Sequence, residues 1–131
     1  MLNVKIKRLS ETAIKPTYGS AKAAGMDLYA NLPTERINIA PHSTAKIGCG
    51  FAFQPEDGYC GLILARSGMA TKQGLAPANK VGLADEDYTG EYIVALHNHS
   101  DAFQVVNQGD RIAQLMFIPY EQANLIEVDE L

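Results

Sequence analysis

The 131-residue sequence has no tryptophan and only two cysteines, Cys49 and Cys60, which do not form a CxxC pair. Two thiols at this spacing give neither a disulfide framework nor a metal cluster, so we expect them to be small buried residues. No apolar run approaches the length of a membrane span, and the opening MLNVKIKRLSE alternates instead of forming the apolar block of a signal peptide. The sequence therefore predicts a cytoplasmic protein that does not bind a membrane.

A basic excess is also absent, because 11 lysines and arginines face 15 aspartates and glutamates and the net charge is −4. Non-specific binding to nucleic acid depends on clustered cations that neutralise phosphates. We therefore expect no nucleic-acid partner. A phosphorylated ligand would need local cations of its own or a metal ion.

Low-complexity stretches, internal repeats and linkers are missing as well. The length falls within the range of one domain that buries a single core, and 47% hydrophobic residues is an ordinary globular composition. The sequence therefore predicts one domain over residues 1–131.

The hydrophobic periodicity is mostly two, which is typical of strands. Leu2, Val4 and Ile6 alternate with polar residues, and EYIVALHN and AFQVV alternate in the same way, with turn sequences such as QPEDG and NQGD between the runs. Only SGMATKQG, residues 67–74, is compatible with a helix, with Ser67 as its cap and Gly74 at its end. The pattern predicts an all-β barrel or sandwich with one short helix.

Four stretches carry the polar residues that chemistry would need. AAGMDLYA places Asp27 beside a bend, and ARSGMA places Arg66 and Ser67 at a helical turn, where free amides, a hydroxyl and a guanidinium can bind a phosphate. GLADEDYTGEY crowds three carboxylates before a tyrosine, and GDRIAQLMF is a turn followed by a strand. Taken singly, each has a structural alternative: a bend, an N-cap beside a surface arginine, a solvated acidic turn and a core strand.

Together, AGMDL, RSGMA, NKVGLADEDYTGE and GDRIAQLMF resemble motifs one to four of the homotrimeric dUTPase family, which hydrolyses dUTP to dUMP and pyrophosphate. The resemblance covers about Ser20 to Tyr120. It implies a distorted jelly roll of the β-clip type whose three copies form active sites at the subunit interfaces.

The resemblance implies that Asp85 orients the attacking water and touches the sugar 3′-hydroxyl. In an extended segment Glu86 would point to the opposite side from Asp85, and we expect Glu86 and Asp87 to be turn residues. Tyr88 would lie against the deoxyribose, where its ring leaves no room for a 2′-hydroxyl. The alternative for Tyr88 is a strand-edge aromatic.

The resemblance also implies that Val81–Ala84 and Glu91–Leu96 form a hairpin whose main-chain groups pair with the uracil edge. A fixed set of backbone donors and acceptors rejects the amine of cytosine, and a tight pocket rejects the methyl group of thymine. The implied substrate-binding residues of this pocket are Asn79, Leu83, Ala84 and Ile93. Asn79 has the alternative of a plain turn asparagine.

The phosphates would be held by Arg66, Ser67 and Gly68, with Gln114 nearby. Asp27 resembles the family aspartate beside the metal and the triphosphate. Because Mg²⁺ keeps most of its waters and shares substrate phosphates, we expect Asp27 to act on the ion through water. Arg111 has two interpretations, a phosphate contact and a structural ion pair.

The chain departs from the family pattern at Ala65, Ala84 and Thr89, which changes packing more than chemistry. The family's fifth motif, a mobile glycine-rich segment with an arginine and an aromatic, has no counterpart after Arg111. Either such a segment lies beyond Leu131 or the protein works without one. The favoured function is dUTP diphosphatase; the alternatives are a catalytically weak, nucleotide-responsive regulatory protein of the same fold, as some viral relatives are, and a dCTP deaminase.

Overall fold

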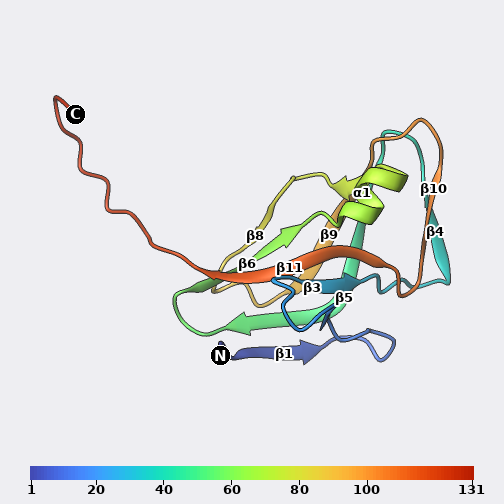
Figure 1. Ribbon diagram of the computed structural model, residues 1–131, viewed down its shortest axis with the longest axis horizontal. Helices are drawn as coiled ribbons and strands as arrows, with labels where there is room; N and C mark the ends of the chain where they lie inside the picture. The colour runs from blue at the N-terminus through green and yellow to red at the C-terminus, as the bar shows by residue number, and fades with distance from the viewer.

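The computed structural model describes residues 1–131 and contains eleven strands and one helix. Figure 1 shows the strands as two packed layers, with a two-stranded ribbon at one end. The strands are β1 (Val4–Arg8), β2 (Thr17–Tyr18), β3 (Met26–Tyr29), β4 (Arg36–Ile39), β5 (Thr44–Pro55), β6 (Tyr59–Leu64), β7 (Leu75–Pro77), β8 (Gly82–Ala84), β9 (Glu91–Asn98), β10 (Gln104–Asn107) and β11 (Arg111–Pro119). The all-β prediction with one short helix is confirmed.

The first layer is a four-stranded sheet in the order β1-β5-β9-β7, and every neighbouring pair is antiparallel. The register between β5 and β9 shifts between Gly48 and Ala52, where the chain bulges. The carboxylate of Glu91 accepts a hydrogen bond from the Gly50 amide at 2.8 Å, which satisfies a donor that the bulge leaves without a strand partner. Gly50 has φ of 76°, so the bulge also requires a residue that tolerates the left-handed region.

The second layer is a five-stranded sheet in the order β2-β3-β11-β6-β8. β11 lies in the middle and pairs with β3 on one side and β6 on the other. β8 pairs only with β6 and forms the edge of the sheet. The predicted hairpin of residues 81–84 and 91–96 is therefore wrong, because its two strands belong to different sheets and the turn between them crosses from one layer to the other.

Alternating side chains of β9 enter the space between the layers. Tyr92, Val94 and Leu96 are buried, whereas Ile93 between them is half exposed. Tyr92 stacks against Phe53 with ring centroids 4.5 Å apart, and both belong to one core cluster of 20 buried residues. Burial of this apolar surface is the main source of stability for the sheets.

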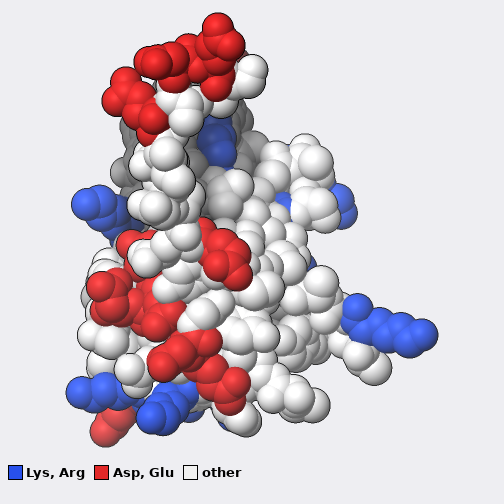
Figure 2. All heavy atoms as spheres, turned by 90° about the vertical axis from the view of Figure 1, so that its left-hand side faces the viewer, with Lys and Arg blue, Asp and Glu red and all other residues white.

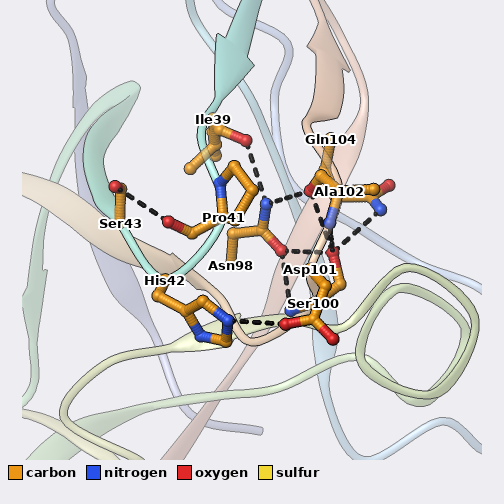
Figure 3. Close-up of polar contacts among 9 residues, drawn as sticks. All are labelled: Ile39, Pro41, His42, Ser43, Asn98, Ser100, Asp101, Ala102 and Gln104. Carbon is orange, nitrogen blue, oxygen red and sulfur yellow. Dashed lines mark hydrogen bonds and ion pairs between the residues drawn. The ribbon is translucent and has the colours of Figure 1, made fainter.

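Asn98, the last residue of β9, is the buried polar residue of the core (Figure 3). Its side-chain amide donates to the Ile39 carbonyl at 2.9 Å and to the Ala102 carbonyl at 2.7 Å. Its side-chain oxygen accepts from the amide and the hydroxyl of Ser100, at 2.9 and 2.7 Å. With every polar group satisfied, Asn98 joins the first sheet to the ribbon of β4 and β10.

The helix α1 spans Ser67–Gln73 and ends at Gly74, whose φ of 68° is the left-handed C-cap that the sequence predicts. The prediction that Ser67 caps the helix is wrong. Arg66 holds the extended N-cap conformation and Ser67 is the first helical residue, with no side-chain cap hydrogen bond. The cap position is therefore shifted by one residue, because β6 continues as extended chain through Arg66.

Both cysteines are buried and free, as predicted. Burial raises the pKa of the Cys49 thiol to about 11, which keeps it in the unreactive thiol form. None of the helices is long and apolar enough to cross a membrane.

Residues 120–131 leave β11 as an extended segment that projects from the strands (Figure 1). Figure 2 shows that acidic side chains gather on the face from which this segment projects. Asp85, Glu86, Asp87 and Glu121 line a hollow on that side. This part of the surface repels phosphate groups, so phosphate binding needs cations elsewhere.

Candidate active site

Arg66 and Asp27 form an ion pair at one end of the five-stranded sheet. The Arg66 Nε donates to a carboxylate oxygen of Asp27 at 2.8 Å, and the two side chains are 24% and 15% exposed. A guanidinium bonded through Nε keeps its terminal nitrogens available for a second anion. Asp27 therefore holds the Arg66 guanidinium in place, with its terminal nitrogens available toward solvent.

Strand register brings the residues of this cluster together. Gln114 of β11 pairs with Asp27 of β3 on one side and with Leu64 of β6 on the other, two residues before Arg66. The Gln114 amide donates to the Ala65 carbonyl at 2.8 Å. Gln114 therefore fixes the loop that presents Arg66, and its amide nitrogen is already engaged.

Ser67 and Gly68 are exposed at the first turn of α1, as the phosphate-binding prediction requires. The first intrahelical hydrogen bond runs from the Ala70 amide to the Arg66 carbonyl at 2.9 Å. The amides that precede it have no intrahelical acceptor, so they point outward beside Arg66. A side chain at position 68 would meet no atom within 4 Å, so this surface is open.

Asp27 has little capacity left for a metal ion. Arg66 takes one carboxylate oxygen, and the Arg111 guanidinium lies 3.8 Å from the other. No group of three or more His, Cys, Asp or Glu side chains is arranged as a metal site. Arg111 lies within ion-pair distance of Asp27, which agrees with one of its two interpretations. The water-mediated role of Asp27 at a metal ion stays a prediction.

The second group of predicted residues surrounds a pocket of about 210 Å³ between β8 and β9. Leu83 and Ile93 are 63% and 46% exposed, which is unusual for large apolar side chains. The edge of β8 that faces away from β6 has no strand partner, so its main-chain groups are free to pair with a ligand. The pocket is lined by Ile63, Asn79, Gly82, Leu83, Ala84, Asp85, Tyr88, Glu91, Tyr92 and Ile93.

Ala84 and Asn79, the other two residues predicted to bind the base, also line the pocket. Ala84 is buried at the pocket wall. Asn79 is an exposed turn residue whose carbonyl accepts from the Val81 amide at 2.7 Å, and its side chain lies beside Gly82. Asn79 thus satisfies both of its interpretations, since it sits in a turn and lines the pocket.

Tyr88 is held rigidly at the mouth of the pocket. Its hydroxyl donates to the Glu91 carbonyl at 2.9 Å, and its ring centroid lies 6.1 Å from that of Tyr92 at an interplanar angle of 30°. A Cβ at Gly90 would lie 2.7 Å from the Tyr88 hydroxyl, so a larger residue there would require the Tyr88 ring to move. The hydrogen bond to Glu91 and the contact with Tyr92 orient the ring as a wall of the pocket.

Asp85 begins a turn in which the Tyr88 amide donates to the Asp85 carbonyl at 3.0 Å. The Asp85 side chain is exposed beside the pocket. Glu86 and Asp87 are turn residues, as predicted. Glu86 points away from the pocket and accepts hydrogen bonds from Gly58 and Tyr120.

The Asp85 end and the Arg66 end of the site are far apart in one chain. β8 and β3 are separated by β6 and β11, and the register places Asp85 about four residues along the sheet from Asp27. Strand spacing and rise put the two aspartates about 20 Å apart. A triphosphate is much shorter than this distance, so the structure does not join the two groups into one site.

Sequence reasoning missed two residues near the pocket. Tyr92 lies beneath it with a buried hydroxyl that has no hydrogen-bond partner, and burial raises the pKa of Tyr92 to about 12. Its place in an alternating strand indicated only a core aromatic. Tyr120 contacts Glu86 across 34 residues of sequence, and no local pattern indicated that contact.

Comparison with known proteins identifies the family. A family model described as dUTPase matches residues 11–131. The deoxyuridine 5′-triphosphate nucleotidohydrolase of Nautilia profundicola is 42% identical over 130 residues, covering 99% of this chain and 89% of the relative. The enzyme of the same name from Syntrophotalea carbinolica is 41% identical, with 99% and 88% covered. The chain belongs to the dUTPase family.

Solved structures agree on the fold. The dUTPase of Staphylococcus bacteriophage 80alpha with dUpNHpp superposes with a TM-score of 0.88 at 24% identity, covering 98% of this chain and 89% of that chain. A dUTPase from phage phi11 of S. aureus, described with a structural Mg(II) ion, gives a TM-score of 0.84 at 26% identity, with 98% and 97% covered. The overall fold is therefore the distorted jelly roll of the dUTPases.

Proposed function

We propose that this protein hydrolyses dUTP to dUMP and pyrophosphate, with Asp85 orienting the attacking water. The observation that carries the proposal is the pocket between β8 and β9, which has a free main-chain edge, a fixed aromatic wall and the Asp85 carboxylate at its mouth. Each of these features suits one part of a deoxyuridine nucleotide.

The uracil ring enters the pocket between Leu83 and Ile93, and its polar edge pairs with main-chain groups of β8. Backbone groups cannot rotate to suit another base, so cytosine would leave a donor or an acceptor unpaired. A wall that fits closely around the base would reject the extra methyl group of thymine. The deoxyribose then lies against Tyr88, whose fixed ring excludes a 2′-hydroxyl.

The triphosphate binds to Arg66 and to the amides of Ser67 and Gly68, with Gln114 holding the loop behind them. Mg²⁺ bound to the triphosphate neutralises charge that would otherwise repel a nucleophile. Asp27 meets the hydrated ion through water while it holds Arg66 in place. Because Arg66 and Arg111 lie against the two oxygens of Asp27, the ion would keep its waters and its bonds to the substrate.

Hydrolysis requires a water aligned with the α-phosphorus and a group that accepts its proton. Asp85 is an exposed carboxylate beside the pocket mouth, where it can hold that water by a hydrogen bond and touch the sugar 3′-hydroxyl. The water oxygen forms a bond to the α-phosphorus as the bond to the bridging oxygen breaks, and pyrophosphate leaves. The fixed turn and ring keep the carboxylate in position before the substrate arrives.

The complete site forms between copies of the chain in a homotrimer. The supporting observation is the separation of about 20 Å between Asp85 and Asp27, estimated from strand spacing and register. A heterologous interface repeated around a three-fold axis would bring the Asp85 end of one copy to the Arg66 end of the next. Each trimer would then hold three equivalent sites.

The proposal includes a cytoplasmic location and one dUTPase-like domain over residues 1–131. Two free buried cysteines support a reducing compartment, and one cluster of 20 buried residues supports a single domain. Residues 112–131 contain no glycine and no arginine, so they hold no fifth motif of the family type.

Pyrophosphate release from dUTP, dCTP, dTTP and UTP, each with and without Mg²⁺, tests the proposed function. We expect release from dUTP alone at a substantial rate, and only with Mg²⁺. Ammonia release from dCTP would indicate a deaminase instead. Tight binding of dUTP without turnover would indicate a regulatory protein. Light scattering at micromolar concentration tests the trimer, which a monomer would contradict.

A further inference from the structure

The acidic turn contacts the end of the last strand through one side chain. A single carboxylate oxygen of Glu86 accepts two hydrogen bonds, from the Gly58 amide at 2.7 Å and from the Tyr120 hydroxyl at 2.6 Å. The Tyr120 amide donates in turn to the Gly58 carbonyl at 3.1 Å. Three segments therefore meet at Glu86: the β5–β6 turn, the residue after β11, and the turn of residues 85–88.

The ends of this turn are held by Ala84, which pairs with Gly61, and by the Tyr88 ring beside Tyr92, whereas its middle is held only through Glu86. The hydrogen bond from the Tyr88 amide to the Asp85 carbonyl is internal to the turn, and the Tyr88 hydroxyl reaches only Glu91, the first residue of β9. Behind the turn lies a hollow of about 560 Å³ between Cys60, Leu83 and residues 120–122. No side chain fills this space, so packing alone does not fix where the turn sits.

We propose that Glu86 is a positioning residue, which, held by Tyr120 and Gly58, fixes the turn that carries Asp85. The inference rests on the proposed role of Asp85 as the group that orients the attacking water. Asp85 is exposed and has no side-chain hydrogen bond of its own, so its place depends on the backbone of the turn. The contact with Tyr120 also ties that backbone to the start of the C-terminal segment.

The charge state of Glu86 supports this arrangement. The hydrogen bonds from the Tyr120 hydroxyl and the Gly58 amide lower the pKa of Glu86, and the same contact with Glu86 raises the pKa of Tyr120 to about 12. Glu86 therefore remains an anion and Tyr120 a donor near neutral pH. Both groups keep the states that the contact needs.

Three variants separate positioning from a merely structural role. Glu86→Ala removes both hydrogen bonds, Tyr120→Phe removes one, and Glu86→Gln keeps an oxygen that accepts both. Loss of the contacts lets the turn move toward the hollow, and a shift of about 1 Å in reacting groups costs up to about 100-fold in rate. KM should change less than kcat, because the proposed uracil and phosphate contacts lie elsewhere and only the sugar contacts belong to the turn.

We expect kcat for dUTP to fall about 10- to 100-fold in Glu86→Ala, by less in Tyr120→Phe, and to recover most of its value in Glu86→Gln. Glu35→Ala and Tyr18→Phe are matched controls, since these exposed residues lie outside the site, and both should keep wild-type kcat. Thermal melts confirm folding. Tyr120→Phe removes one oxygen from a surface side chain and tests the same contact if Glu86→Ala unfolds.

Unchanged kcat in folded Glu86→Ala and Tyr120→Phe, beside an inactive Asp85→Asn, would overturn the positioning role and leave the proposed function intact. An equal loss in Glu86→Gln and Glu86→Ala would also overturn it, because the hydrogen-bond geometry is then not what matters. Normal turnover in Asp85→Asn would instead remove the role of Asp85 on which the inference rests.

Discussion

The Asp85 end and the Arg66 end of the molecule differ in how their charged groups are paired and in how exposed their side chains are. At the Arg66 end, charged groups are paired with each other and half-buried, and Gln114 locks the loop beneath them. At the Asp85 end, the carboxylate is exposed and large apolar side chains such as Leu83 face solvent. The Arg66 end is organised without a ligand, whereas the Asp85 end leaves surface that a ligand or a second copy would cover.

The difference shows how one small fold divides the work of a phosphate-hydrolysing site. Binding a polyanion requires cations that hold their geometry, and the strand register around β11 supplies that geometry. Under the proposed mechanism, base recognition uses the open edge of β8 and water orientation uses the turn of residues 85–88. Within one chain the two ends lie about 20 Å apart, so the acidic turn does not pair with the arginine of the same chain.

Asp85→Asn should have the largest effect on catalysis. Asparagine keeps the shape of the side chain but cannot accept a proton, so we expect kcat to fall roughly 10² to 10⁴-fold. KM for dUTP and the melting temperature should change little, because the side chain is exposed and lies outside the core. Steady-state pyrophosphate release measures both constants, and near-normal kcat would remove Asp85 from the proposed role.

Arg66→Ala should mainly weaken binding. Losing charge-assisted hydrogen bonds to the triphosphate is expected to lower kcat/KM about 10- to 100-fold. Arg111→Ala is the matched comparison, because this arginine is 55% exposed and lies 3.8 Å from Asp27. We expect a loss below about threefold there. Equal losses in the two variants would show that the ends are not specialised as described.

Variants of Tyr88 test the Asp85 end through the preference for dUTP over UTP. Tyr88→Ala should lower the preference for dUTP over UTP about tenfold, because removing the ring makes room for a 2′-hydroxyl. Tyr88→Phe loses only the hydrogen bond to the Glu91 carbonyl and should keep most of the preference. The ratio of kcat/KM for the two nucleotides is the measurement. An unchanged ratio in the alanine variant would assign selectivity to another residue.

Tyr92→Phe should have the smallest effect, and in the stabilising direction. The buried Tyr92 hydroxyl has no partner, and such a group costs about 1 to 3 kcal/mol. Its pKa is about 12 in the folded protein against 10.0 ordinarily, so the wild type loses stability as pH rises from 10 to 12. The phenylalanine variant should melt no lower at neutral pH and lose less stability in alkali. A clear drop in melting temperature at pH 7 would indicate a hydrogen bond to the hydroxyl.

Local patterns predicted the strands well where neighbours in sequence decide the structure. β9 spans the predicted EYIVALHN run, because Tyr92, Val94 and Leu96 alternate on one buried face. The hairpin prediction failed because β8 pairs with β6, whose partner residues lie 19 to 23 positions away, and sequence proximity to β9 suggested the wrong partner. The hydrophobic periodicity of a strand does not show which distant strand it pairs with.

The candidate site shows the same limit. The resemblance named residues at both ends, but their separation depends on the order of four strands in one sheet. The contact between Glu86 and Tyr120 could not be predicted either, since Glu86 was expected only as a turn residue and Tyr120 lies 34 positions away in the sequence. Residue types indicate chemistry, and only the fold decides which of them meet.

Mixing two impaired variants tests the shared site most directly. Asp85→Asn chains keep Arg66, and Arg66→Ala chains keep Asp85, so mixed trimers contain some sites in which both residues are intact. After unfolding and refolding together in equal amounts, random assembly should restore about a quarter of the activity of wild-type protein treated in the same way. Activity no greater than the sum of the two variants refolded separately would mean that one chain supplies both residues, and would contradict the account.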